Sequence, residues 1–287
     1  TMKKNINREQ YQKKLRRKKR RLRPRLWFFL VLVTIFITMI IYSCSTLFNW
    51  NQDNKDVKKI EEVIENNVQP VEKKEQGNLV NPPTEKDSDY WYYVNVPFYD
   101  VDFSKLLKKN PDTVAFIHVP NTNINYPIVQ TNDNEYYLNH AFDKSKNDAG
   151  WVYMDYRNSS NFSNDNTIIY GHGRVNKTVF GSLKDTLTDK WQSDKSNYVI
   201  QISTLTTNFV YQIFSIYTIK SESYYITPAF STTEKKENWL STMKKRNIAP
   251  IDTNINVNDK IITLSTCQNN NGGRIVVQGK LIKEQSK

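Results

Sequence analysis

The residues best suited to chemistry are a cysteine and an arginine, seven residues apart near the C-terminus. Cys267 ends the apolar run IITLSTC, an Asn/Gly-rich turn follows, and Arg274 begins a second apolar run, RIVV. This pattern predicts two strands joined by a turn. A nearby cation favours the thiolate, which is the nucleophilic form of cysteine. We therefore expect Cys267 to be a nucleophile and Arg274 to supply a fixed charge and hydrogen bonds to an oxyanion.

A cysteine nucleophile needs a group that accepts and returns a proton, and His172 is the best candidate of the three histidines. It follows the predicted strand TIIYG and stands between Gly171 and Gly173, in a turn where the backbone can approach a ligand. His118 lies in VAFIHVP and His140 in EYYLNHAF, and we expect structural roles for both. The set has no evident Asp or Asn partner, unlike a papain-type triad.

The N-terminal part of the chain predicts a membrane anchor. Residues 1–25 contain 13 Lys/Arg and one acid, which accounts for the whole formal charge of +12. No charged residue occurs between Arg25 and Asp53, and the almost wholly apolar run 26–48 is long enough to span a bilayer. A cleaved signal peptide is the alternative, but its apolar core is shorter and ends at a small-residue cleavage site.

The excess of basic residues before the apolar run sets the expected topology, with the N-terminus in the cytoplasm and the rest of the chain outside. Nucleic-acid binding is not expected, because the charge serves orientation in the membrane. We expect four segments: a basic cytoplasmic tail (1–25), a transmembrane anchor (26–48), a polar stalk or linker (49–88) and a catalytic domain (89–287).

Cysteine usage adds to the case for chemistry. Cys44 lies in the apolar run, which leaves Cys267 as the one cysteine of the exported part. A lone thiol in an oxidising compartment has no intramolecular disulfide partner and needs a reason to be there. The alternatives to a reactive thiol are a buried inert one and an intermolecular disulfide.

The exported part predicts a mainly β fold. Residues 56–66 within the stalk and residues 102–110 have helical apolar spacing, and a further helix is expected within 231–247, with Thr232 or Thr233 as its cap. Short β-rich runs separated by Asn, Asp, Gly and Pro favour a closed β-barrel of about eight strands. The expected strands are 114–119, 126–130, 151–154, 167–170, 198–202, 209–219, 260–265 and 274–282.

These motifs, in this order, resemble the sortases, the cysteine transpeptidases of Gram-positive bacteria. The resemblance rests on TLSTC, on an arginine seven residues later that opens RIVVQGKLI, and on YGH upstream. The stretches NYPIVQ, YYLNHAF, AGWVYMDYRN and TIIYGH, and the helix-containing insertion before TLSTC, are similar to the class B branch. The resemblance covers residues 95–282, about two thirds of the chain.

The resemblance implies a sortase-type barrel and cysteine transpeptidation. By motif position, Cys267 matches the family's nucleophile, His172 its histidine and Arg274 its arginine. The thiolate would attack the Thr carbonyl of a C-terminal sorting signal, NPxTN-like or PxTG-like, in an exported protein. An amine, normally on a peptidoglycan cross-bridge, would then resolve the thioacyl enzyme. Weaker candidates for substrate contact are Ser265, Thr266 and Tyr170.

Three other functions stay open at this point. A pilin-polymerising sortase would use a Lys side chain as the acceptor, a thiol protease would use water, and a catalytically idle membrane-tethered domain would only bind. We expect no cofactor and no metal, because no carboxylate cluster with a Ca²⁺-loop pattern is present.

Overall fold

The computed structural model describes residues 24–67, 71–73, 77–83, 88–267 and 273–287. Most of the expected basic tail therefore lies outside the described residues. The chain divides into two compact units, residues 1–52 and 53–287. Helix α2 (Pro24–Asn67) begins in the first unit and ends in the second. Its apolar part is exposed and is long and apolar enough to cross a membrane.

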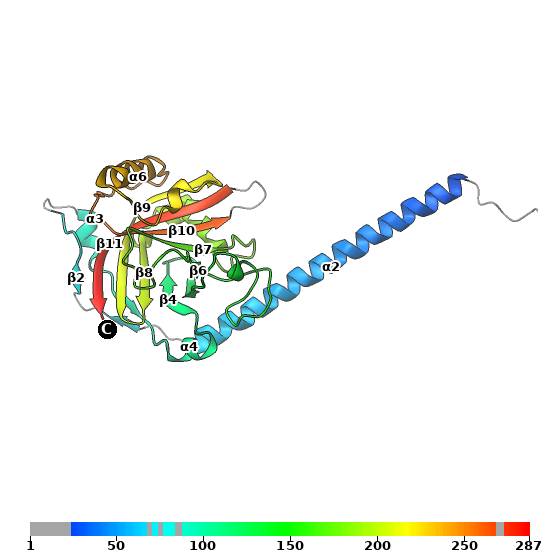
Figure 1. Ribbon diagram of the computed structural model, residues 1–287, viewed down its shortest axis with the longest axis horizontal. Coiled ribbons are helices and arrows are strands. Elements are labelled where there is room, and N and C mark those ends of the chain that lie inside the picture. Colours follow the sequence, from blue (N-terminus) through cyan, green and yellow to red (C-terminus); the bar gives the residue numbers. More distant parts are fainter. Residues whose placement is uncertain (1–23, 68–70, 74–76, 84–87, 268–272) are drawn as a thin grey trace, which may run out of the picture. The chain divides into compact units, whose positions relative to one another are not determined.

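The second unit is built around a closed barrel of eight strands, as the sequence predicts (Figure 1). The hydrogen-bonded order is β10-β7-β6-β5-β4-β8-β9-β11, and the pairing of β11 with β10 closes the ring. The barrel strands are β4 (Thr113–His118), β5 (Asn125–Val129), β6 (Tyr153–Met154), β7 (Asn166–Gly171), β8 (Val199–Thr204), β9 (Thr207–Lys220), β10 (Ile261–Cys267) and β11 (Gly273–Ser286).

Among the described residues, three short strands lie outside the ring. β2 (Asn78–Leu79) pairs with the far end of β11, and β1 (Val71–Lys73) pairs with β3 (Phe98–Asp100). Most neighbours within the ring are antiparallel, and the two exceptions are β5 with β6 and β7 with β10. The second exception matters for the site, because parallel strands end at the same edge of a sheet.

Helices surround the barrel at several points. The expected helix at 102–110 is present as α4 (Ser104–Lys109). The other short helical elements are α3 (Ser88–Tyr93), η1 (Tyr136–Leu138), η2 (Gly181–Leu187), α5 (Asp189–Gln192), η3 (Lys195–Asn197) and η4 (Tyr224–Ile226).

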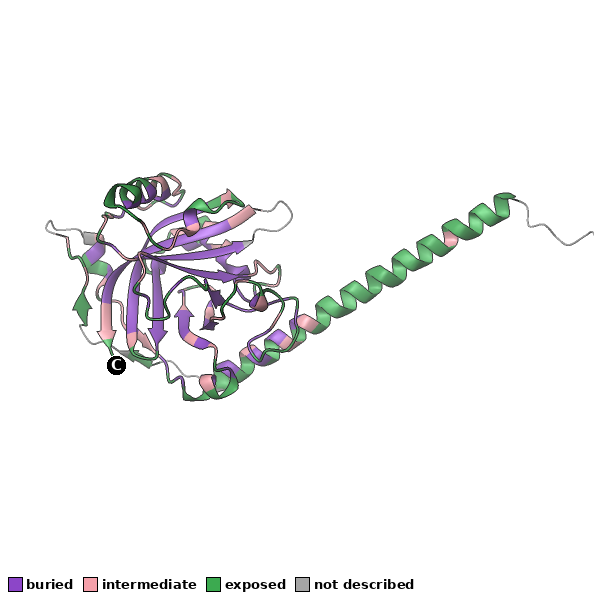
Figure 2. Cartoon of the chain, viewed as in Figure 1, coloured by how far each residue is buried: buried purple, intermediate pink, exposed green. Residues whose placement is uncertain are grey.

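Helix α6 (Thr233–Lys245) lies in the connection from β9 to β10, where the sequence predicts it. Thr232 caps it, since its side-chain oxygen accepts a hydrogen bond from the Lys235 amide at 3.3 Å. The buried face of the helix packs on the outside of the barrel, as Figure 2 shows. Its buried apolar residues are the expected stripe of Trp239, Leu240 and Met243.

Helix α6 covers β9 near Phe214 and Tyr217, so that this part of the strand is buried on both faces. Ile213 and Ile216 belong to the main core, whereas Phe214 and Tyr217 belong to the cluster under α6. A strand with one solvent-exposed face alternates apolar and polar residues, whereas a strand covered on both faces is buried along its length. Asn208 to Tyr217 are accordingly all buried.

The segment before the barrel differs from the expected polar stalk. Residues 56–66 are helical, as predicted, but they continue α2 and belong to the second compact unit, which begins at Asp53. Val57, Ile60 and Ile64 are buried in the same core as the barrel strands. Their spacing places them on one helix face. The segment is nevertheless polar on average, because Lys, Glu and Asn residues occupy the other positions.

Candidate active site

The register of three neighbouring strands brings the predicted catalytic residues to one edge of the barrel. β7 and β10 run parallel, with Thr266 opposite Gly171. β10 and β11 run antiparallel, with Cys267 opposite Arg274. His172 is the residue directly after Gly171. Because paired strands lie about 4.8 Å apart, the backbone places Cys267 on β10 between Arg274 on β11 and His172, which directly follows β7.

Each catalytic candidate has a different local setting. Cys267 is the last residue of β10, and its side chain lies outside the described part of the structure, as does the turn 268–272. Arg274 stands at the start of β11, half-buried, with Cys267 opposite it on one side and Ile219 of β9 on the other. A guanidinium keeps its charge at any ordinary pH, so this edge carries a permanent cation.

The ring of His172 is oriented by a backbone carbonyl. His172 is half-exposed, and its Nε2 lies 2.8 Å from the carbonyl oxygen of Leu138, at the end of η1. A carbonyl oxygen only accepts, so Nε2 carries the proton that it donates. In the neutral ring Nδ1 is then the basic nitrogen. This partner cannot be predicted from the sequence, because a residue of any type could supply a main-chain carbonyl oxygen.

Two glycines lie close to side chains around His172, one against the histidine ring and one against Phe180. Gly150 has φ +59°, and a Cβ on it would lie 2.8 Å from Cδ2 of His172 and 2.5 Å from the carbonyl oxygen of Tyr137. A Cβ on Gly171 would lie 2.7 Å from the ring of Phe180. Both positions exclude a side chain for steric reasons. Gly171 therefore makes room for a neighbouring aromatic ring.

The three weaker candidates, Ser265, Thr266 and Tyr170, are buried on β10 and β7 close to the ends of these strands. Ser265 and Thr266 are each 1% exposed, and the Ser265 hydroxyl shares a hydrogen bond of 2.9 Å with the hydroxyl of Tyr225. The hydroxyl of Tyr170 donates to a carboxylate oxygen of Asp155 at 2.8 Å. The side chains of Ser265 and Tyr170 thus have partners inside the protein.

Asp155 and Arg157 form a charged support behind Tyr170 that the sequence pattern does not reveal. Arg157 donates to both carboxylate oxygens of Asp155, at 2.8 and 2.6 Å. Burial alone would raise the pKa of Asp155, but these hydrogen bonds outweigh it and lower the pKa. Burial and the neighbouring carboxylate raise the pKa of Tyr170 far above its usual value, so its hydroxyl remains a donor.

The other two histidines make packing contacts. His118 stacks on Tyr99 with ring centroids 4.6 Å apart, and burial lowers its pKa. His140 stacks on Tyr136 at 4.0 Å, and its Nδ1 lies 2.7 Å from the carbonyl oxygen of that residue. These contacts agree with structural roles.

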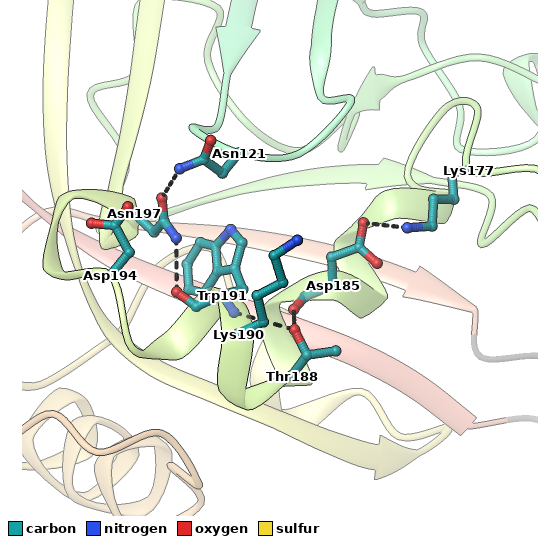
Figure 3. Close-up of a pocket in the computed structure, with 8 residues that line it drawn as sticks. All are labelled: Asn121, Lys177, Asp185, Thr188, Lys190, Trp191, Asp194 and Asn197. Atoms are coloured by element: carbon teal, nitrogen blue, oxygen red, sulfur yellow. Dashed lines mark hydrogen bonds and ion pairs between the residues drawn. The ribbon is translucent and has the colours of Figure 1, made fainter.

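One pocket of the described residues lies apart from the predicted catalytic residues. This pocket has a volume of about 540 Å³ and is lined by the η2–α5–η3 segment together with Asn121 and Lys177, as drawn in Figure 3. Its polar side chains largely bond one another: Asn121 donates to Asn197 at 2.7 Å, and Lys177 pairs with Asp185 at 2.9 Å. Within the described residues, no group of three or more His, Cys, Asp or Glu side chains is arranged to hold a metal ion.

Comparison with known proteins gives consistent matches over the barrel. The sortase domain family matches residues 117–282. Sortase B of Listeria monocytogenes is 35% identical over 180 residues, which are 62% of this chain and 72% of that protein. The matched range contains His172, Cys267 and Arg274.

Two solved structures are similar in fold and sequence. A Staphylococcus aureus sortase B–substrate complex has a TM-score of 0.58 and 33% identity, and the match covers 63% of this chain and 84% of that one. A crystal structure of sortase B complexed with triglycine has a TM-score of 0.59 and 33% identity, with 63% and 85% covered.

Proposed function

The chain belongs to the sortase family of cysteine transpeptidases, and we propose on this basis that Cys267, His172 and Arg274 carry its catalysis. The matched relatives are sortase B proteins, which confirms the class B resemblance. The observation that supports the residue assignment is the strand register, which pairs Cys267 with Arg274 and pairs Thr266 with Gly171, the residue before His172.

In the first half-reaction the Cys267 thiolate attacks the carbonyl carbon of the Thr in a C-terminal sorting signal. The oxyanion that forms collapses, the peptide C–N bond breaks, and the leaving amine takes a proton from His172. The products are a thioacyl enzyme on Cys267 and the released C-terminal peptide. The Nε2–H group donates to the Leu138 carbonyl, so Nδ1 is the ring nitrogen that takes the proton of the Cys267 thiol when the thiolate forms and then delivers it to the leaving amine.

In the second half-reaction an amine attacks the thioester carbonyl and gives its extra proton to His172. The tetrahedral intermediate collapses and expels the Cys267 thiolate, so the enzyme returns to its starting state with a new amide in the product. Arg274 stabilises the oxyanion of both intermediates, and the support for this role is its position directly opposite Cys267 in the β10–β11 pair.

The acceptor we propose is an amine of the peptidoglycan cross-bridge, and the substrates are exported proteins with an NPxTN-like or PxTG-like signal. Support comes from relatives: one sortase B structure is a complex with triglycine and another is a substrate complex. We further propose that α2 anchors the enzyme as a single-pass membrane protein with the barrel outside the cell, because its apolar part follows a strongly basic segment.

The test is a mass measurement on the full-length enzyme in detergent. Peptides with NPxTN-like and PxTG-like signals are supplied alone, with triglycine, or with an acceptor peptide that contains a Lys side chain. We expect a thioacyl adduct on Cys267 without the amine and a ligated peptide with it, from one peptide class only. A ligated product with a Lys side chain and none with triglycine would favour the pilin-polymerising alternative. Hydrolysis that triglycine leaves unchanged would indicate a protease, and no adduct with either peptide would overturn the proposal.

A further inference from the structure

The loop that directly follows His172 contains strained backbone positions. We call residues 173–180 the histidine loop. Its ends meet through a bridge between Gly173 and Val179, and the amide of Phe180 donates to the His172 carbonyl at 3.2 Å. Lys177 and Val179 have φ values of +65° and +52°. A β-branched residue such as Val179 adopts this conformation only where its surroundings hold it there.

A two-bond relay connects Val179 to helix α2. The Val179 amide donates to the Tyr126 hydroxyl at 3.0 Å, and that hydroxyl donates to a carboxylate oxygen of Glu61 at 2.6 Å. Tyr126 is 4% exposed. A buried amide without an acceptor is strongly disfavoured, so Glu61 and Tyr126 help to hold Val179 in its strained conformation.

A second contact joins the same helix to the other side of the loop. The side-chain oxygen of Asn54 accepts hydrogen bonds from the guanidinium of Arg174 and, at 2.9 Å, from the amide of Asn176. Asn54 is 8% exposed. One oxygen on α2 thus fixes two side chains of the loop, two and four residues beyond the histidine.

A third contact joins α2 to the segment that contains Gly150, which packs against the His172 ring. The side-chain amide of Asn147 donates to the main-chain oxygen of Asp53 at 3.1 Å, and its side-chain oxygen accepts from the Ala149 amide at 2.8 Å. The next residue is Gly150, whose backbone packs close to the His172 ring. The same end of α2 therefore contacts segments on two sides of the ring.

We propose that residues 53–61 of α2 position the catalytic histidine, with Asn54 and Glu61 as positioning residues that act through the histidine loop. This inference rests on the proposed role of His172. It also assigns a function to the chain that directly follows the apolar part of α2: the helix that leaves the anchor completes the support of the active-site loop.

The experiment compares variants of the full-length enzyme in detergent micelles by two independent readouts. Hydrogen–deuterium exchange of peptides from residues 173–180 reports the loop, and kcat/KM for triglycine ligation reports the site. The test variants are Asn54→Ala, Glu61→Ala and Tyr126→Phe. Lys55→Ala and Glu62→Ala are matched controls, because these neighbours are exposed on the same helix. Glu61→Gln is the conservative variant, since it keeps an acceptor oxygen for Tyr126.

We expect each test variant to speed exchange of the histidine loop and to lower kcat/KM by roughly tenfold, because small misplacements of a catalytic group have large effects on rate. Peptides from β8 and β9 should keep wild-type protection. Glu61→Gln and both controls should stay within twofold of wild type. The Glu61→Ala/Tyr126→Phe double variant should be no worse than Tyr126→Phe alone, because both changes break one relay.

Loop exchange that stays at the wild-type rate in Asn54→Ala and Glu61→Ala would overturn the inference. Faster loop exchange with unchanged kcat/KM would overturn its catalytic part. Equal losses in the two controls, or exchange that also rises in β8 and β9, would reduce the effect to general destabilisation. The exchange readout does not depend on turnover, so a failure of the proposed transpeptidation would appear separately, as an inactive wild type.

Discussion

The carbonyl oxygen of Leu138 lies 2.8 Å from Nε2 of His172, and this contact assigns different tasks to the two ring nitrogens. Nε2 donates the hydrogen bond that orients the ring, and in the mechanism we propose Nδ1 exchanges protons with the reacting groups. In many cysteine and serine hydrolases a carboxylate or amide side chain orients the histidine. In this protein the backbone oxygen of Leu138 orients the histidine, which agrees with the lack of an evident Asp or Asn partner for His172 in the sequence.

Gly150→Ala should displace the histidine ring. The new Cβ would lie 2.8 Å from Cδ2 of His172, and φ +59° disfavours any L side chain. We expect a loss of about 1–3 kcal/mol in the free energy of unfolding and at least a tenfold fall in kcat per folded molecule. Both are measured by chemical denaturation and by steady-state kinetics at a temperature where the variant is folded.

Gly77→Ala provides the control for that variant. Gly77 has φ +56°, and its Cβ would approach Phe98 and the Glu284 carbonyl at 2.6 and 2.8 Å, away from His172. The expected outcome is a similar loss of stability with normal kcat. A similar fall in kcat in both variants would mean that strain in general, and not contact with His172, lowers activity.

Cys267→Ala should abolish cleavage and transfer while leaving the fold intact, because covalent capture needs the sulfur. Turnover of sorting peptides and the far-UV circular dichroism spectrum test the two halves of this statement. Measurable turnover by the purified variant would refute the assignment of the nucleophile.

Arg274→Lys should lower kcat by on the order of 10²–10³ if the guanidinium donates to the oxyanion, because Lys keeps the charge but loses the planar set of donors. If Arg274 only biased Cys267 toward the thiolate, Lys would nearly restore the rate. Measuring kcat together with the pH dependence of Cys267 alkylation separates the two roles. Turnover within a few-fold of wild type would rule out the aimed oxyanion contact.

Asp155 should make the fold sensitive to acid. Its pKa is lower in the folded chain than the usual value of 3.8, so its ionised form stabilises the fold above that value. The contribution is lost as pH falls from about 3.8 through the folded pKa. Asp155→Asn should therefore flatten the decline in unfolding free energy below pH 4, and destabilise the enzyme by about 1–3 kcal/mol at neutral pH. Glu62→Gln, at an exposed acid on α2, should change neither. An unchanged acid slope in Asp155→Asn would contradict this assignment.

Much of this architecture is readable from the sequence because its signals are local. Turn residues separate eight apolar runs, and all eight appear as strands. His172, Cys267 and Arg274 each stand at the end or start of such a run, where strand pairing can bring them together. Thr232 and the apolar stripe of α6 likewise depend on neighbours within a few residues.

The parts that the sequence does not reveal depend on long-range contacts. The partner of His172 is the main chain of Leu138, which any residue type could supply. Ser265 and Tyr170 are polar residues near the motif, but their burial and bonding follow from strands that close around them. Helical spacing in residues 56–66 predicts a helix without indicating the surface on which it packs.

The packing of residues 56–66 leads to a prediction about truncation. A chain of residues 49–287 lacks the basic tail and the apolar run but keeps the whole second compact unit, which begins at Asp53. We expect it to be soluble, with peptide turnover within a few-fold of the full-length enzyme in detergent. A loss of tenfold or more in a folded 49–287 domain would mean that the anchor contributes to the site itself.

A chain of residues 68–287 should behave differently, although it keeps the entire barrel. It loses the buried side chains of Val57, Ile60 and Ile64, and burying each such side chain contributes about 1.5–3 kcal/mol. Because whole domains are stable by only about 5–15 kcal/mol, we expect the shorter chain to unfold at a much lower denaturant concentration and to turn over peptide poorly even where it is folded. Urea titrations of the two domains, together with ligation assays at low denaturant, test this. If 68–287 matched 49–287 in both measurements, residues 53–67 would be a dispensable linker, as their polar composition alone suggests.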